Sequence, residues 1–247
     1  MKKIIFLLFF FPSLIHFCLG QADQSSFGFI VSPTLGWMNN NDNLINSNGV
    51  RLGMKLGGIG EYYASDWLII YGGATFSLSQ GGTLLHKFGG DLLPDSKLSD
   101  PQINSGQKPL PDDVEIKYSL QLFEVPVGLR YEIGLINQPF DLYFIFPEFN
   151  LGIISKSIGA IQATGISLEK QDIGKDVKAF NFAWGIGAGL KLPMQNQHYS
   201  TFGIHLQKGL SDVTANNGYR INANGNRETE DSKASLNSLI FKFAYFF

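Results

Sequence analysis

The chain has 247 residues and a formal net charge of −2, and only 16% of its residues are charged, against ~25% in a usual soluble domain. Aromatic residues make up 13% of the sequence, and 28 residues are glycine. Beyond residue 20 no segment approaches 18 uninterrupted apolar residues, so membrane-spanning helices are excluded. The slightly acidic balance argues against a nucleic-acid partner, which would require a basic face.

The first twenty residues have the layout of a secretory signal peptide. Two lysines form a positive n-region, residues 4–11 form an apolar h-region, and we expect cleavage after Gly20. A retained membrane anchor would need about 20 apolar residues, more than this run offers. Cleavage would remove Cys18, the single cysteine, and leave residues 21–247 as one domain without a disulfide.

Eight segments alternate apolar residues with small or polar ones, in the period of two that a β-strand requires. They span about residues 26–38, 49–62, 67–79, 116–133, 140–154, 179–192, 200–211 and 236–247. The alternation is strictest around Ile186 on the apolar face and Gly187 on the small-residue face. It slips near Gln121–Phe123 and near Phe146–Pro147, which indicates β-bulges at both places.

The last predicted strand has one strongly aromatic face. This face consists of Leu239, Phe241, Phe243, Tyr245 and Phe247. Such a face needs a non-aqueous surface, and the outer membrane of Gram-negative bacteria provides one. Because lipid cannot hydrogen-bond to the backbone, strands can cross it only as a closed barrel.

The connections between the predicted strands alternate in length. Those after the second, fourth and sixth strands are short, whereas residues 39–48, 80–115, 155–178 and 212–235 form long connections rich in turn residues. The sequence therefore predicts an all-β fold: an eight-stranded antiparallel up-and-down transmembrane β-barrel with short periplasmic turns and long extracellular loops. A soluble lipocalin-type barrel is the alternative, but there the large apolar residues point inward. Small residues suit the interior of a narrow membrane barrel better than a solvated exterior.

Three motifs resemble one known family. The run YSLQLFEVPVGLRYEI (Tyr118 to Ile133) is similar to a characteristic strand of the PorT-like outer-membrane β-barrel proteins. SLSQGGTLL (Ser77 to Leu85) and GIHLQKGLSDV (Gly203 to Val213) support this resemblance. It implies an eight-stranded outer-membrane barrel, and the namesake of the family implies a component of the type IX protein-secretion machinery.

Several charged residues fall on the face opposite the apolar residues of the predicted strands. They are Arg51, Lys55, Glu124, Arg130, Glu148, Lys191 and Lys242. Side chains just fill the interior of an eight-stranded barrel, so buried charges there must pair or be neutralised. We therefore predict a structural salt-bridge network in the lumen, with a proton or small-ion path as the alternative.

Two of these charges are carboxylates that we expect to lie close together. A turn centred between residues 136 and 137 would place position 124 opposite position 149, and thus Glu124 near Glu148. Two carboxylates in a dry site need a cation or a shared proton. The candidate cations are Arg51, Lys55 and Lys191.

No motif predicts a catalytic, cofactor or metal site. His86, His198 and His205 are widely separated and lack the spacing of metal ligands. His86 is predicted to lie on the surface, in an outer loop near Asp91 and Asp95. The glycines of residues 185–189 resemble a nucleotide loop, but they lie within a predicted strand and no helix follows.

These observations favour a protein with a structural or interaction role in the cell envelope. Its barrel would contact outer-membrane lipid, and its outer loops would bind another envelope protein or a surface polymer. The first alternative is the secretion component that the PorT-like resemblance implies. A narrow pore or an envelope lipid-modifying enzyme is the second.

Overall fold

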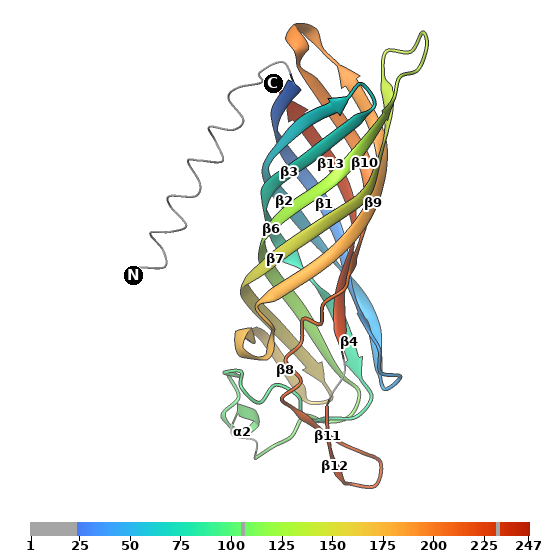
Figure 1. Ribbon diagram of the computed structural model, residues 1–247. Coiled ribbons are helices and arrows are strands. Elements are labelled where there is room, and N and C mark those ends of the chain that lie inside the picture. Colours follow the sequence, from blue (N-terminus) through green and yellow to red (C-terminus); the bar gives the residue numbers. More distant parts are fainter. Residues whose placement is uncertain (1–23, 105–106, 231–232) are drawn as a thin grey trace, which may run out of the picture.

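The computed structural model describes residues 24–104, 107–230 and 233–247, which form an elongated closed β-barrel (Figure 1). The predicted signal peptide, residues 1–20, lies outside the described residues. None of the described helices is long and apolar enough to cross a membrane.

Eight strands of the described chain close the barrel. They are β1 (Ser25–Asn40), β2 (Ile45–Ser65), β3 (Leu68–Gln80), β6 (Val114–Ile133), β7 (Asp141–Ala163), β9 (Phe180–Pro193), β10 (Tyr199–Gly209) and β13 (Ala234–Phe246). Each is antiparallel to the next, and β13 returns to β1, where Tyr245 faces Phe29. The predicted all-β, up-and-down barrel is confirmed.

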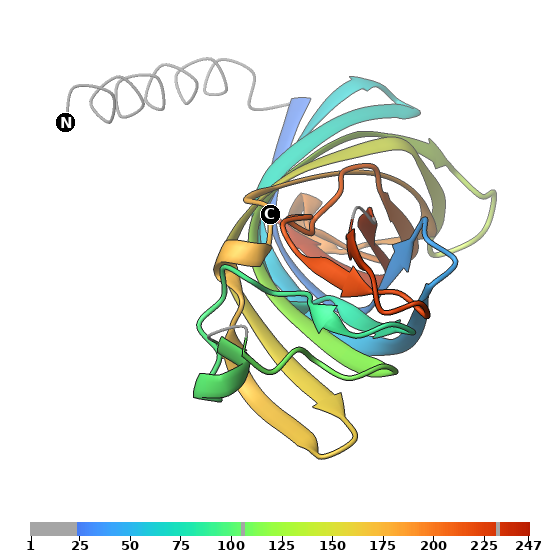
Figure 2. The same ribbon diagram turned by 90° about the horizontal axis from the view of Figure 1, so that it is seen from below.

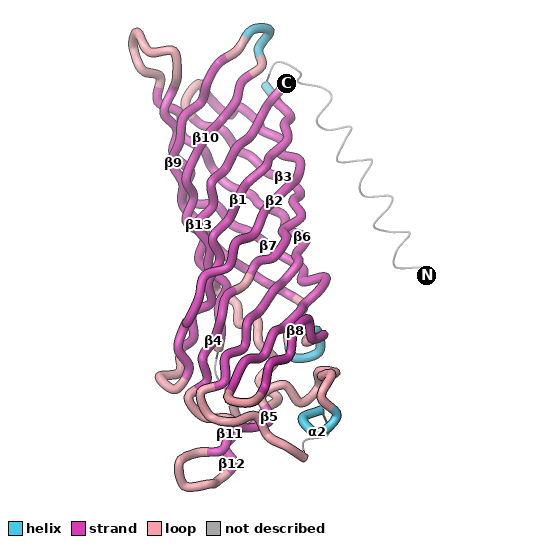
Figure 3. The backbone as a smooth tube through the Cα atoms, turned by 180° about the vertical axis from the view of Figure 1, so that it is seen from behind, coloured by secondary structure: helices cyan, strands magenta, loops and turns pink. Residues whose placement is uncertain are grey.

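Shorter elements extend the barrel at one end (Figure 3). Strand β4 (Gly82–His86) continues β3 between β2 and β6, and β8 (Ile166–Asp172) pairs with β7 beyond the barrel wall. A small sheet of β5 (Gly90–Asp91), β11 (Tyr219–Ile221) and β12 (Arg227–Thr229) lies beyond the opening, beside α2 (Pro101–Asn104). Two 3-10 helices, η2 (Gly174–Asp176) and η3 (Gln195–Gln197), complete the described elements.

The two ends of the barrel differ sharply. Short turns follow β2, β6 and β9 at the end where the C-terminus lies, here called the turn end. The opposite end, the loop end, carries β5, β8, α2, β11 and β12 (Figure 1). In Figure 2 the region around β11 lies across the opening at the loop end, whereas the β7–β8 hairpin projects to one side.

Two of the predicted long loops are wrong in extent. Strands β1 and β2 continue to Asn40 and Ile45, so the connection predicted over 39–48 is a turn of four residues. Much of 155–178 is a hairpin of β7 and β8. Where these strands extend past the apolar band, exposed side chains such as Asn46 and Gln162 are polar, whereas Ile45 and Ile161 point into the core of the barrel mouth. The outward apolar face that identifies a membrane strand therefore disappears there.

The outer wall carries a broad apolar band. Phe29 is 65% exposed, Leu52 75% and Ile186 42%, and their neighbours on the same strands point inward. Aromatic rings contact one another along this surface, as Phe202 does with Phe243 across the β10–β13 pair. The outward direction predicted for the apolar residues of β1, β2, β9 and β13 is confirmed.

The lumen has two chemically different halves. Toward the loop end, large apolar residues of the wall, including Leu120 and Leu122 of β6, form one buried core with residues beyond the barrel such as Leu92 and Val213. Toward the turn end, a smaller cluster that includes Tyr71 and Phe246 surrounds buried charges. The expectation that small residues predominate in the interior is therefore wrong for the loop half.

Strand β7 contains a bulge at Phe146–Pro147, as predicted. On its two sides, Gly128 of β6 pairs with Glu148 and Arg130 pairs with Ile145, so two residues of β7 face one residue of β6. Beyond the bulge, the residues of β7 that point inward change from odd-numbered to even-numbered ones. Glu148 therefore points into the lumen, as Ile145 does before the bulge.

The second irregularity lies where β6 passes Gln121–Phe123, but it belongs to β7. Gln121 pairs with Lys156 and Leu122 with Ile154, which leaves Ser155 of β7 as the extra residue. Strand β6 itself alternates without interruption. The apparent slip in the sequence arises because the inward residues of β6 change from apolar at Leu122 to polar at Glu124.

The outward direction of Ile186 gives a testable prediction for the wall. Ile186→Arg places a charge in the middle of the apolar band and should cost about 2–4 kcal/mol of unfolding free energy. Gln195→Arg, in the exposed β9–β10 turn, is the matched control and should cost little. Urea titration with heat-modifiable gel mobility measures both. An Ile186→Arg barrel as stable as the parent would show that the register of β9 is wrong.

Candidate functional site

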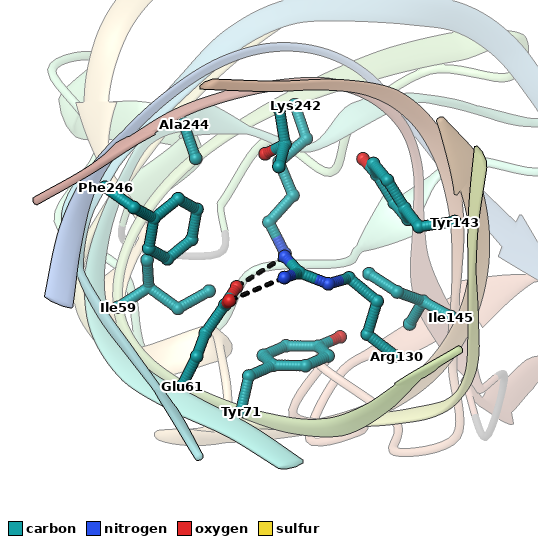
Figure 4. Close-up of a pocket in the computed structure, with 10 residues that line it drawn as sticks. Ile59, Glu61, Tyr71, Arg130, Tyr143, Ile145, Lys242, Ala244 and Phe246 are labelled. Atoms are coloured by element: carbon teal, nitrogen blue, oxygen red, sulfur yellow. Dashed lines mark hydrogen bonds and ion pairs between the residues drawn. The ribbon is translucent and has the colours of Figure 1, made fainter. Parts of the chain in front are cut away.

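The turn half of the lumen is organised around Arg130 of β6 (Figure 4). Its guanidinium group binds both carboxylate oxygens of Glu61, at 2.5 and 2.6 Å, and lies 2.7 Å from Glu132. The rings of Tyr143, Tyr199 and Phe246 lie 5.6–5.8 Å from the guanidinium carbon. Planar, two-point pairing and stacking on aromatic rings are the contacts that suit arginine better than lysine.

Glu61 and Glu132 are partners that sequence reasoning missed. Glu61 is 4% exposed and also accepts a hydrogen bond from the Tyr199 hydroxyl, and Glu132 binds Lys191 at 2.8 Å. Both residues lie on the inward face of their strands. Glu61 is on the same face of β2 as Lys55, and Glu132 is on the same face of β6 as Arg130. Extending the alternation to the turn end of each strand would have found them.

Two further ion pairs follow along the lumen. Glu148 accepts a hydrogen bond from Tyr71 and lies 3.5 Å from Lys242 and 3.6 Å from His205 Nδ1. Closer to the loop half, Lys55 binds Glu124 at 2.8 Å and Gln207 at 2.7 Å.

The predicted pairing of Glu124 with Glu148 is wrong. Glu124 lies opposite Gly152, and Glu148 lies opposite Gly128, because the turn is offset from the predicted centre and β7 contains the bulge. Each carboxylate has its own lysine, which is Lys55 for Glu124 and Lys242 for Glu148.

Lys191, Arg51 and His86 have other surroundings in the structure than the sequence predicts. Lys191 pairs with Glu132 rather than with the predicted acids. Arg51 has the inward parity of β2, but it makes no ion pair within the described residues, and its Nε has no hydrogen-bond partner there. His86 is 5% exposed, so its predicted surface position is wrong: β4 continues β3 and points this residue inward.

The described residues between β4 and β6 and between β10 and β13 form a cap over the loop half. Leu92, Leu93, Leu98, Ile103, Leu110 and Val213 of this cap are buried in the apolar core of the barrel mouth. Burying one such side chain contributes about 1.5–3 kcal/mol, so the cap is held by a core of its own.

Polar contacts also fasten the cap. Arg220 binds Asp42 of the β1–β2 turn, and Lys178 binds Asp212. Burial alone would raise the pKa of Asp212, but hydrogen bonds from Lys178 and Thr214 outweigh it and hold this pKa below its ordinary value. The ionised carboxylate is therefore the form that the folded cap stabilises.

The lumen offers little free space between its side chains. Cavities of about 10 Å³ beside Arg130 and about 20 Å³ beside His205 lie in the turn half. Within the described residues, no group of three or more His, Cys, Asp and Glu side chains could hold a metal ion. The arrangement neutralises charge and fills the barrel.

An open groove of about 340 Å³ lies at the rim, where β10 separates from β13. The pairing of these strands ends at Gln207 and Ser238, after which Leu210 hydrogen-bonds to Phe182 of β9. The groove is lined by Asn39, Asn40, Asn41, Lys208, Gly209, Leu210, Ser211, Asp212, Lys233, Ala234 and Ser235. Lys208 and Lys233 are both exposed.

A family model described as "Outer membrane protein beta-barrel domain" matches residues 21–215. The chain matches no curated protein. Among solved structures, OprG from Pseudomonas aeruginosa is 10% identical, with a TM-score of 0.43 over 92% of this chain and 98% of that one. Neisserial surface protein A is 10% identical, with a TM-score of 0.38 over 91% and 98%. Ail of Yersinia pestis is 11% identical, with a TM-score of 0.36 over 91% and 99%.

The ion pairs of Arg130 predict that replacing it destabilises the barrel far more than replacing Arg51, the other arginine of the lumen. Arg130→Met leaves Glu61 and Glu132 buried with less compensating charge and should cost about 3–5 kcal/mol of unfolding free energy. Arg51→Met removes an arginine that makes no ion pair among the described residues, and should cost far less. The midpoint of urea unfolding in detergent, followed by gel mobility, compares them. Equal losses would contradict the assigned network.

Proposed function

Because the chain belongs to the outer membrane protein beta-barrel domain family, we propose that it is a structural and interaction protein whose capped outer face binds a partner at the cell surface. The barrel lies in the outer membrane, with lipid against its apolar band. The loop end then faces outward. The observation that carries the proposal is the cap, which is folded around its own apolar core.

A folded cap favours binding for an entropic reason. Flexible loops lose conformational freedom when they bind, whereas a surface that is already ordered loses less and binds more tightly for the same contacts. The contacts of Arg220 with Asp42 and of Lys178 with Asp212 fix two parts of the cap relative to the barrel. The outer face therefore presents a fixed pattern of side chains.

The rim groove is the part of this face that we propose as the binding site. Among the described residues that line the groove, the one acid is Asp212, which Lys178 already neutralises, so the groove keeps the positive charges of Lys208 and Lys233. Asparagine amides add donors along one side. A volume of about 340 Å³ is in the range of ligand sites. This chemistry fits an anionic surface polymer.

The binding test uses the whole barrel in nanodiscs, with dextran sulfate as an anionic probe and neutral dextran as its uncharged counterpart. The parent should bind dextran sulfate only, and binding should weaken as salt increases. Lys208→Glu with Lys233→Glu should lower the affinity at least tenfold, which is about 1.4 kcal/mol. The matched control is Lys170→Glu with Lys175→Glu, which makes the same charge change in β8 and η2 and should leave the affinity near that of the parent.

An equal loss of affinity for dextran sulfate in both double variants would show that binding depends only on net charge. It would contradict the groove as the binding site. Binding of neutral dextran by the parent would contradict the anionic partner. A part in type IX secretion, which the PorT-like motif implies, stays a prediction, and secreted proteins of a deletion strain would test it.

The filled lumen also bears on the alternative of a narrow pore. An apolar core closes the loop half, and paired charges occupy the turn half. Water and ions would have to displace buried side chains to cross. We expect the parent to give no discrete conductance steps in a planar bilayer, with a known porin as the positive control. Regular steps from the parent would favour the pore.

A further inference from the structure

Four buried side chains in the turn half of the lumen each have a polar atom without a hydrogen-bond partner among the described residues. The atoms are Ser32 Oγ, Thr75 Oγ1, Asn150 Oδ1 and His205 Nε2. These residues are only 1–5% exposed. Native proteins satisfy nearly all buried polar atoms, so four such atoms in one region need an explanation.

All four side chains line the same cavity, whose volume is about 20 Å³. They belong to β1, β3, β7 and β10, which are alternate strands around the barrel. A cavity needs about 10–15 Å³ to hold one water molecule, and the water needs two to four polar partners. This cavity satisfies both conditions for a single water.

The hydrogen-bonding capacity of the four atoms also matches water. His205 Nδ1 faces the Glu148 carboxylate at 3.6 Å, which favours the proton on Nδ1 and leaves Nε2 as an acceptor. Asn150 Oδ1 is a second acceptor, and the hydroxyl groups of Ser32 and Thr75 can donate. Two acceptors and two donors are what one water molecule satisfies.

Charge argues for a neutral occupant. Lys55 and Lys242 also line the cavity, and each faces its own carboxylate, Glu124 at 2.8 Å and Glu148 at 3.5 Å. With a neutral imidazole at His205, the charges around the cavity cancel. An ion would bring an unbalanced charge into a dry interior, where desolvation is costly.

We infer that this cavity is a binding site for one ordered water molecule, which accepts hydrogen bonds from Ser32 and Thr75 and donates them to Asn150 and His205. The water joins four alternate strands across the lumen and holds the His205 imidazole in its Nδ1-protonated form. The bulge of β7 is what points Asn150 toward this water.

Nuclear magnetic resonance of the refolded barrel with ¹⁵N-labelled histidine tests the site directly. We expect His205 to carry its proton on Nδ1 alone and its ring protons to show a cross-peak to a slowly exchanging water. His205→Gln identifies the signals. A doubly protonated ring, a proton on Nε2, or no contact with water would overturn the inference.

Bromide soaking of crystals distinguishes water from an anion. A peak of anomalous scattering in the cavity would show that the site takes a halide and would overturn the proposal. We expect ordinary water density there and no anomalous signal.

Conservative variants test the two donors. Ser32→Ala with Thr75→Val should weaken the cross-peak between His205 and water at least tenfold. Thr201→Val is the matched control. Thr201, on β10, is buried like Ser32 and Thr75, but it lines the other cavity, beside Arg130. Thr201→Val should leave the cross-peak unchanged. A cross-peak that survives in the Ser32→Ala, Thr75→Val double variant would contradict the inference. If the double variant fails to fold, the measurements on the parent protein still decide.

Discussion

The inability of lipid to hydrogen-bond is the constraint from which the rest of this structure follows. Each strand within the apolar band must find both its neighbours inside the protein, so β13 has to return to β1. Closure with eight strands leaves an interior only as wide as the side chains that fill it. Charges on the inner face other than Arg51 are therefore brought near opposite charges, and pairs such as Arg130 and Glu61 are the result.

The two halves of the lumen solve the filling problem in different ways. The turn half uses long charged and aromatic side chains that reach across the barrel, and the loop half uses aliphatic side chains together with a cap folded down from outside. The first solution neutralises charge, whereas the second removes apolar surface from water. Both solutions leave the exposed side chains of the cap unused, because buried side chains alone fill the lumen.

Much of the wall could be predicted from the sequence, because one apolar face per strand is a strong periodic signal. Ile186 and Phe243 illustrate it, since each alternates with small or polar neighbours. The pairing of Glu124 and Glu148 could not be predicted, because the offset of one turn and one bulge shift the register by several residues. The buried position of His86 could not be predicted either, because the sequence predicts residues 80–115 as one long connection. Only the tertiary structure shows that β4 continues the wall.

The pairing of β1 with β13 has a consequence for how the molecule forms. Gly28 lies beside Phe246, so the contact that completes the sheet joins residues from the two extremes of the domain. Contacts between residues so distant in sequence make folding slow, because loop-closure entropy must be overcome before they contribute. Until β13 pairs with β1, each of these strands exposes an unpaired backbone edge that can associate with other chains. Assembly of this protein therefore has a vulnerable stage that lasts until β13 pairs with β1.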